Sequence, residues 1–151
     1  MDTSNDVQWM QQALDLADQA ENHGEVPIGA ILVNNNVCIG QGWNQPISSH
    51  DPSAHAEIIA LRQAGAHISN YRFPDATLYV TLEPCLMCIG ALLHARIKRV
   101  VFGAQDGKIG TLSHYAPLLN TAILNHQIIW QGGCLADACA LKLRDFFKLR
   151  R

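Results

Sequence analysis

The chain has 151 residues and a mass of 16.6 kDa, a size that suits one folded domain spanning residues 1–151. Its 48% hydrophobic content and mean hydropathy of +0.03 exclude an intrinsically disordered chain. The formal net charge is only −2, but residues 1–95 hold 2 basic and 10 acidic residues, whereas residues 96–151 hold 9 basic and 3 acidic. The near-neutral total therefore conceals a basic C-terminal third.

The N-terminus carries acidic residues, no Lys or Arg among its first ten positions, and no apolar run of the secretory kind. The most apolar stretch, residues 26–33, is too short for a membrane span, which needs about 20 residues. Five cysteines make an odd number, unlike a small disulfide scaffold. We expect a soluble protein without membrane contact, in the cytoplasm.

Apolar spacing predicts an amphipathic helix over residues 6–23, then a β-hairpin of two apolar runs, 26–33 and 37–42, joined by three asparagines. Asp51-Pro52-Ser53 predicts the start of a helix over 54–64, ended by Gly65. The expected elements that follow are a strand over 77–82, a helix over 85–95, a strand over 99–103, a turn at Asp106-Gly107, a helix over 115–124, a strand over 127–130 and a helix over 135–150. This alternation predicts an α/β fold whose partly parallel sheet lies between two helical layers.

Two short segments carry the chemistry: His55-Ala56-Glu57 and Glu83-Pro84-Cys85-Leu86-Met87-Cys88. One imidazole and two thiols are the ligand count of a catalytic zinc that keeps its fourth position for water. Cys85 and Cys88, three residues apart, share a helix face. His55 and Glu57 point about 200° apart on a helix, so they converge only beyond its N-terminus. There Glu57 is free to carry a proton from the zinc-activated water.

Other interpretations of the same cysteines stay open. A Cys-x-x-Cys pair also serves in thioredoxin-like redox proteins, although redox chemistry leaves His55 and Glu57 without a role. A structural zinc needs a fourth ligand. The available candidates are Cys38, Cys134, Cys139, His50 and His94.

The pairing of His-Ala-Glu with Pro-Cys-x-x-Cys resembles the zinc-dependent cytidine and deoxycytidylate deaminase superfamily. Its bacterial branch, which makes inosine at the first anticodon position of tRNA, is the most similar over residues 8–150. The stretches that carry the resemblance are EVPIGAILV (25–33), GWNQPI (42–47), HDPSAHAEIIALRQAG (50–65), residues 70–106 and DFFKLRR (145–151). The resemblance implies a three-layer α/β/α cytidine-deaminase-like fold with a five-stranded mixed sheet, and hydrolytic deamination of a tRNA wobble adenosine.

The resemblance also assigns roles. His55, Cys85 and Cys88 hold one zinc per subunit and Glu57 is the catalytic residue. Substrate contacts fall to Val26, Asn44, Ala56, Pro84, Ala104 and Asp106, with the backbone N–H groups of Ala56 and Cys85 near the attacking oxygen. The implied partners are the anticodon arm of a tRNA and a second copy of the chain, in a homodimer.

The basic C-terminal third suits a phosphate backbone. Its positive residues form one cluster after the expected zinc helix (Arg96, Lys98, Arg99 and Lys108) and one on the last helix (Lys142, Arg144, Lys148, Arg150 and Arg151). Of these, Lys108, Lys148, Arg150 and Arg151 are the expected RNA-backbone contacts, the alternative being a solvated helix face. Two other functions remain: deamination of free guanine, cytosine or a nucleotide, and a non-catalytic, zinc-containing RNA-binding subunit.

Overall fold

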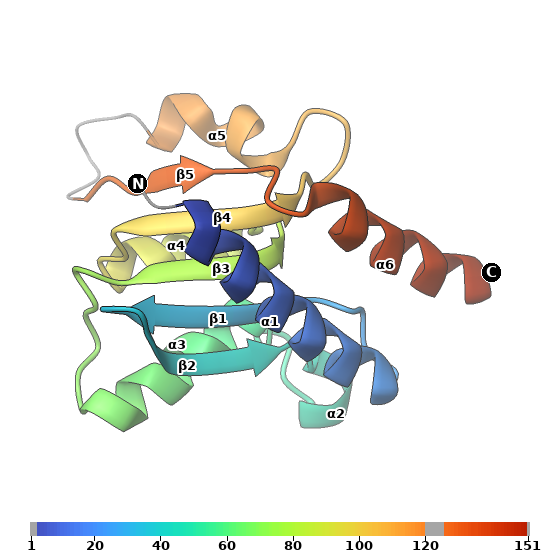
Figure 1. The fold of residues 1–151 in the computed structure, drawn as a ribbon, viewed down its shortest axis with the longest axis horizontal. Coiled ribbons are helices and arrows are strands. Elements are labelled where there is room, and N and C mark those ends of the chain that lie inside the picture. The colour runs from blue at the N-terminus through green and yellow to red at the C-terminus, as the bar shows by residue number, and fades with distance from the viewer. Residues whose placement is uncertain (1–2, 120–125, 151) are drawn as a thin grey trace.

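The computed structural model describes residues 3–119 and 126–150, and in this part of the chain one sheet lies between helices on both of its faces (Figure 1). The strands run in the order β2-β1-β3-β4-β5. In chain order the elements are α1 (Thr3–Asn22), β1 (Gly29–Asn34), β2 (Val37–Trp43), α2 (Pro46–Ser49), α3 (Ala56–Ile68), β3 (Thr77–Leu82), α4 (Leu86–His94), β4 (Arg99–Ala104), α5 (Thr111–Leu119), β5 (Ile129–Gln131) and α6 (Ala136–Leu149).

The sheet is mixed. β1 pairs antiparallel with both β2 and β3, whereas β3, β4 and β5 are parallel. The hairpin between β1 and β2 turns at Asn35 and Asn36, whose φ angles of 51° and 59° match the left-handed conformation that asparagine tolerates. α4 makes the crossover from β3 to β4. The expected α/β fold with a five-stranded mixed sheet is therefore confirmed.

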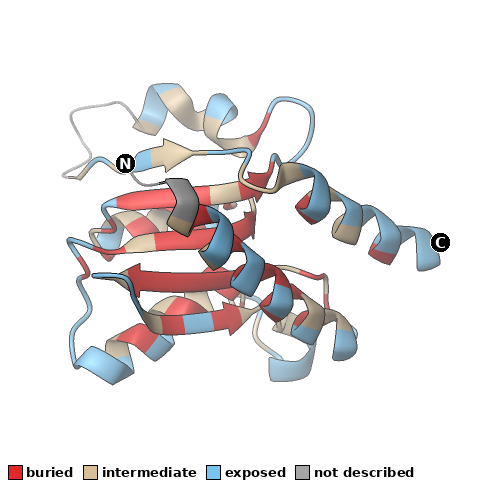
Figure 2. Cartoon of the chain, viewed as in Figure 1, coloured by how far each residue is buried: buried red, intermediate tan, exposed pale blue. Residues whose placement is uncertain are grey.

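Strand alternation divides the core into two clusters, one on each face of the sheet. Ala30 and Leu32 of β1 pack in the cluster that contains residues of α3 and α4, while Ile31 and Val33 pack in the cluster that contains residues of α1 and α6. Figure 2 shows the inner strands largely buried between these layers. The core thus supports the sheet from both sides.

Two glycines of β2 let α3 lie directly on the sheet. A Cβ at Gly40 would come within 2.4 Å of the Ala60 carbonyl oxygen, and one at Gly42 within 2.6 Å of the Ala56 carbonyl oxygen. Any larger residue would push the helix away. This close packing fixes the start of α3, where the His-Ala-Glu segment lies.

Several element boundaries differ from those expected. α3 continues through Gly65 to Ile68 and ends at Ser69, whose φ is 55°. Gly65 lies within a helix already anchored to the sheet, where an internal glycine costs only about 1 kcal/mol. α5 begins at residue 111 rather than 115, and the rest of the expected helix, residues 120–124, lies outside the described residues. The short helix α2 was not predicted.

A buried ion pair attaches the first turns of α1 to the sheet. Arg99 Nη1 and Nη2 donate to the two Asp6 carboxylate oxygens at 2.9 and 2.5 Å, and the Tyr79 hydroxyl donates to Asp6 Oδ1 at 2.8 Å. Arg99 Nε also donates to the Gln131 side chain. Arg99 is therefore a structural residue, and its expected place in a phosphate-binding cluster is wrong. Among the described residues, no helix is long and apolar enough to cross a membrane.

Candidate active site

The three expected metal ligands converge where α3 and α4 begin. His55 and Cys85 are the N-cap residues of these two helices, with extended backbones at ψ 156° and 170°, and neither side chain caps its own helix. His55 Nδ1 lies 3.5 Å from Cys85 Sγ and 3.7 Å from Cys88 Sγ. The ligating atoms all lie within 4.8 Å of one another. Both helices thus direct their positive N-terminal ends at one point.

This geometry fits a zinc ion. Tetrahedral zinc with ordinary Zn–N and Zn–S bond lengths separates its nitrogen and sulfur ligands by about 3.6 Å. The measured separations of 3.5 and 3.7 Å need almost no adjustment. In the described part of the chain no other His, Cys, Asp or Glu joins the three, so the four-ligand structural site is not formed. The donor set fits one zinc per subunit.

A hydrogen bond joins the two thiols. A hydrogen bond from Cys88 and the nearby His55 lower the pKa of Cys85 to about 5. The pKa of Cys88 is raised, first because its thiol donates to Cys85 and then because it is buried. A thiolate at Cys85 is therefore available at neutral pH.

Glu57 lies in the first turn of α3, and only 4% of it is exposed. Burial raises the pKa of its carboxyl group to about 7, because the charged form loses its contact with water. The Cys88 thiol is a hydrogen-bonding neighbour. A carboxyl group that is half protonated near neutrality, beside the metal ligands, suits proton transfer in either direction.

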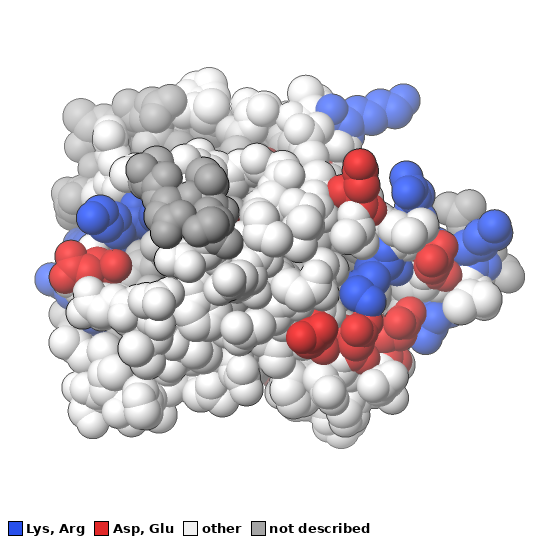
Figure 3. All heavy atoms as spheres, in the orientation of Figure 1, with Lys and Arg blue, Asp and Glu red and all other residues white. Residues whose placement is uncertain are grey.

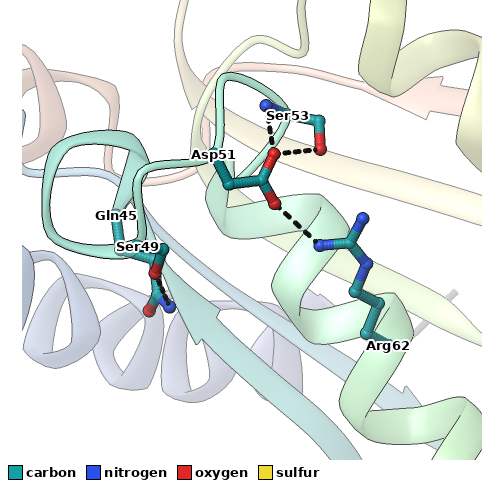
Figure 4. A network of polar contacts seen from close by, with 5 residues as sticks. All are labelled: Gln45, Ser49, Asp51, Ser53 and Arg62. Carbon is teal, nitrogen blue, oxygen red and sulfur yellow. Dashed lines mark hydrogen bonds and ion pairs between the residues drawn. The ribbon is translucent and has the colours of Figure 1, made fainter.

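The turn that leads into His55 is held by side-chain contacts (Figure 4). Asp51 Oδ1 accepts hydrogen bonds from the backbone N–H and the hydroxyl of Ser53, at 2.9 and 2.7 Å, and Asp51 Oδ2 pairs with Arg62 of α3 at 3.2 Å. The segment that follows β2 joins this turn, because the Gln45 backbone N–H donates to the Ala54 carbonyl oxygen at 3.0 Å.

The expected substrate residues Val26 and Asn44 lie on or next to this segment. Asn44 is buried, and its backbone N–H donates to the Ile28 carbonyl oxygen at 3.0 Å. Val26, half-buried, lies two residues before Ile28. Because Gln45 is bonded to Ala54, both residues come close to the start of α3, where Ala56 is fully buried. The structure assembles three of the six expected residues here.

The other three gather around Cys85. Pro84 is buried between β3 and α4, and the Glu83 backbone N–H donates to the Ala104 carbonyl oxygen at 2.8 Å. Asp106 follows in an exposed loop, and its backbone N–H donates to the Glu83 carboxylate at 3.0 Å. Hydrogen bonds thus connect the segment that carries Ala104 and Asp106 to Glu83, which directly precedes Pro84.

Sequence reasoning missed two buried carboxylates that hold these segments. Glu25 accepts hydrogen bonds from the backbone N–H groups of Ile47 and Ser48 and from the Ser48 hydroxyl, at 3.3, 2.7 and 2.5 Å. Glu83 accepts three others, all from the segment that follows β4. Glu83 directly precedes a proline and Glu25 stands two residues before one, and an acidic residue next to an apolar segment was the available signal.

The expected RNA-backbone residues differ in availability. Lys108 and Lys148 are exposed. Arg150 is also exposed, but its guanidinium lies 3.6 Å over the Phe146 ring, and Arg151 lies outside the described residues. Figure 3 shows basic side chains gathered along α6, with acidic side chains next to them. Lys142 of this group pairs with Asp18 of α1, which reduces the net positive charge of the surface.

A mixed sheet that brings a His/Cys/Cys zinc site and a buried glutamate to two helix N-termini defines a zinc-dependent deaminase. Residues 3–104 match the family model of the cytidine and deoxycytidylate deaminase zinc-binding region, and the chain belongs to that family.

One sequence relative and two solved structures are similar to this chain over most of its length. A tRNA-specific adenosine deaminase of Haemophilus influenzae is 51% identical over 97% of this chain and 85% of the relative. A solved structure from studies of A-to-I editing by tRNA:A34 deaminases at the wobble position of transfer RNA superposes with a TM-score of 0.84 and 38% identity, over 90% of this chain and 99% of that one. A structure of NE0047 in complex with 2,6-diaminopurine, at 21% identity and a TM-score of 0.79, covers 97% of this chain and 83% of that one and shares the fold.

Proposed function

We propose that this protein hydrolyses adenosine to inosine at the wobble position of tRNA, in the cytoplasm. The observation that carries the proposal is the zinc site with Glu57 beside it, in a chain 51% identical to a tRNA-specific adenosine deaminase. When bound, the zinc lowers the pKa of a water molecule toward 7 and so makes it a nucleophile at neutral pH. The overall reaction adds water to C6 of adenine and releases the exocyclic amine as ammonia.

The chain's own residues do the rest. Glu57, buried beside the metal ligands, takes a proton from the attacking water and returns it to the adenine. Asn44 and Val26 contact the base from one side of the pocket. Ala104 and Asp106 contact the neighbouring nucleotides from the other. The backbone N–H groups at the starts of α3 and α4 favour the negative charge that develops on the attacking oxygen.

The test is inosine formation by the zinc-loaded protein on an anticodon stem-loop with a wobble adenosine. Free adenosine, guanine and cytosine are run beside it, together with the same stem-loop carrying guanosine at the wobble position. Inosine in the adenosine stem-loop alone supports the proposal. Turnover of a free base would replace the RNA substrate with a small molecule, and no reaction on any of them would return the chain to a non-catalytic RNA-binding subunit.

We also propose that the active form is a homodimer joined across α3 and α4. An exposed groove between these helices is mainly apolar, with Leu61, Phe73 and Ala91 in its walls, and Tyr71 at its rim is 70% exposed. Sedimentation should show a dimer that Ala91→Arg converts to a monomer, because a long charged side chain would fill the groove. Val37→Arg, at an exposed position on β2, is the matched control. A wild-type monomer at working concentration would refute the dimer.

A further inference from the structure

The proposed mechanism leaves Glu83 without a role, although it is a carboxylate with only 4% of its surface exposed, two residues before a zinc ligand. Its carboxylate accepts three backbone hydrogen bonds, all at 3.0 Å. Oε1 accepts from the N–H groups of Asp106 and Thr111, and Oε2 accepts from that of Leu112. Every donor belongs to one segment, residues 106–112, which it holds at both ends.

The segment is built to come this close. Thr111 and Leu112 open α5, so their N–H groups have no partner within the helix, and a carboxylate at that end also suits the helix dipole. Gly110 has a φ of 80°, and a Cβ there would lie 2.9 Å from Glu83 Oε1. Only glycine fits this position without displacing the loop.

This segment is part of a loop, residues 105–112, that is also held by hydrogen bonds within itself. The Gln105 side-chain amide donates to the carbonyl oxygens of Gly107 and Lys108, at 3.2 and 2.8 Å. The exposed side chains of Asp106 and Lys108 are thus carried on a closed loop. What fixes that loop relative to the metal ligands is the Glu83 carboxylate.

We propose that Glu83 is a positioning residue for RNA binding: it joins the zinc-ligand segment to the 105–112 loop and so sets the place at which this loop meets the nucleotides beside the reacting base. Glu83 itself touches neither base nor metal. The inference rests on the proposed function, because the loop needs an RNA to contact. A rigid loop loses less conformational entropy on binding, so RNA affinity should depend on Glu83 more than the chemical step does.

The test is Glu83→Gln, in which an amide NH₂ replaces one acceptor and faces a buried backbone N–H. The affinity for the stem-loop should fall about tenfold, since an unpaired buried donor is costly. Zinc content should stay at one per chain, and the single-turnover rate at saturating RNA should fall far less. Amide hydrogen exchange of residues 106, 111 and 112 should accelerate.

Two further variants separate positioning from general stability. In Gly110→Ala the added Cβ should displace the loop while Glu83 itself is unchanged, and the affinity for the stem-loop should fall as it does in Glu83→Gln. Asp6→Asn removes another buried carboxylate, in the ion pair with Arg99, and should leave RNA affinity unchanged. Unchanged affinity in both loop variants, or an equal loss in Asp6→Asn, would overturn the inference.

Failure of the proposed function is distinguishable from failure of this inference. Absence of inosine with the wild-type protein would remove the proposed function while the exchange rates of the three amides still report whether Glu83 holds the loop. Inosine formation with normal affinity and normal exchange in Glu83→Gln would remove the positioning role alone.

Discussion

The start of α3 and the segment before β1 each bury a glutamate, and the pKa values of the two carboxyl groups are shifted in opposite directions. Burial raises the pKa of Glu57 to about 7. Burial acts on Glu25 in the same sense, but hydrogen bonds from Ser48 and Ile47 outweigh it and lower the pKa of Glu25. Glu57 is 4% exposed and Glu25 1% exposed, so burial alone does not separate them. The hydrogen bonds that a buried carboxyl group accepts therefore decide whether its pKa is raised or lowered.

Glu57→Gln keeps the shape of the side chain and removes its ionisable carboxyl group. We expect single-turnover deamination to fall about a thousandfold or more, the scale of a lost general acid–base group. Zinc content and RNA affinity should persist, because Glu57 is not one of the three ligands. Activity within tenfold of wild type would contradict the proton-transfer role.

Asp6 is a third buried carboxylate, and its main hydrogen-bond donor is the charged guanidinium of Arg99. Asp6→Asn removes this ion pair. The hydrogen bond from Arg99 comes first among the causes that lower the pKa of Asp6. Because the folded pKa lies below the ordinary value of 3.8, the ion pair stabilises the protein above that pH, and the stability is lost as pH falls through the folded pKa. The variant should lose about 3 kcal/mol at pH 7 by urea denaturation. The deficit should shrink as the pH falls below 3.8, and a constant deficit would argue against the ion pair as its source.

Glu25→Gln tests the anchored member of the pair itself. We expect a loss of about 2 kcal/mol at neutral pH, since three hydrogen bonds to a charged acceptor are weakened. The pKa of Glu25 is lowered, so this contribution is present above the unfolded value near 4.5 and disappears as the pH falls through the lower folded value. Denaturation from pH 7 to pH 3 measures it. A deficit that grows on acidification would mean that Glu25 is not an anion in the folded protein.

The smallest effect should come from charges that water already surrounds. Replacing Lys148 and Arg150 by Ala should reduce the slope of log affinity against log salt by about 1 for each phosphate that the variant no longer neutralises. Arg72→Ala, an exposed arginine outside both basic clusters, serves as the control and should leave the slope unchanged. An unchanged slope in the α6 variant would identify that surface as a solvated helix face.

Local chemistry was readable where a motif and its helix coincide. The convergence of His55, Cys85 and Cys88 could be predicted because ligand identity and helix spacing allow few arrangements, and both helix starts were approximately right. The role of Arg99 was misjudged, because a sequence shows that a residue is basic but not that Asp6, 93 positions away, will bury it. The early start of α5 was missed for a related reason, since its N-terminal partner is the distant Glu83.

Residue spacing and residue type predicted the α/β fold class, the partly parallel sheet and the zinc donor set. These depend on periodicity and on residue types a few positions apart, which a linear chain displays directly. The tertiary structure was needed to show which carboxylates accept several hydrogen bonds, which basic residues form no ion pair, and how the 105–112 loop is attached to the metal site. Those features depend on how many backbone donors meet each buried charge, and that number exists only after distant segments have packed together.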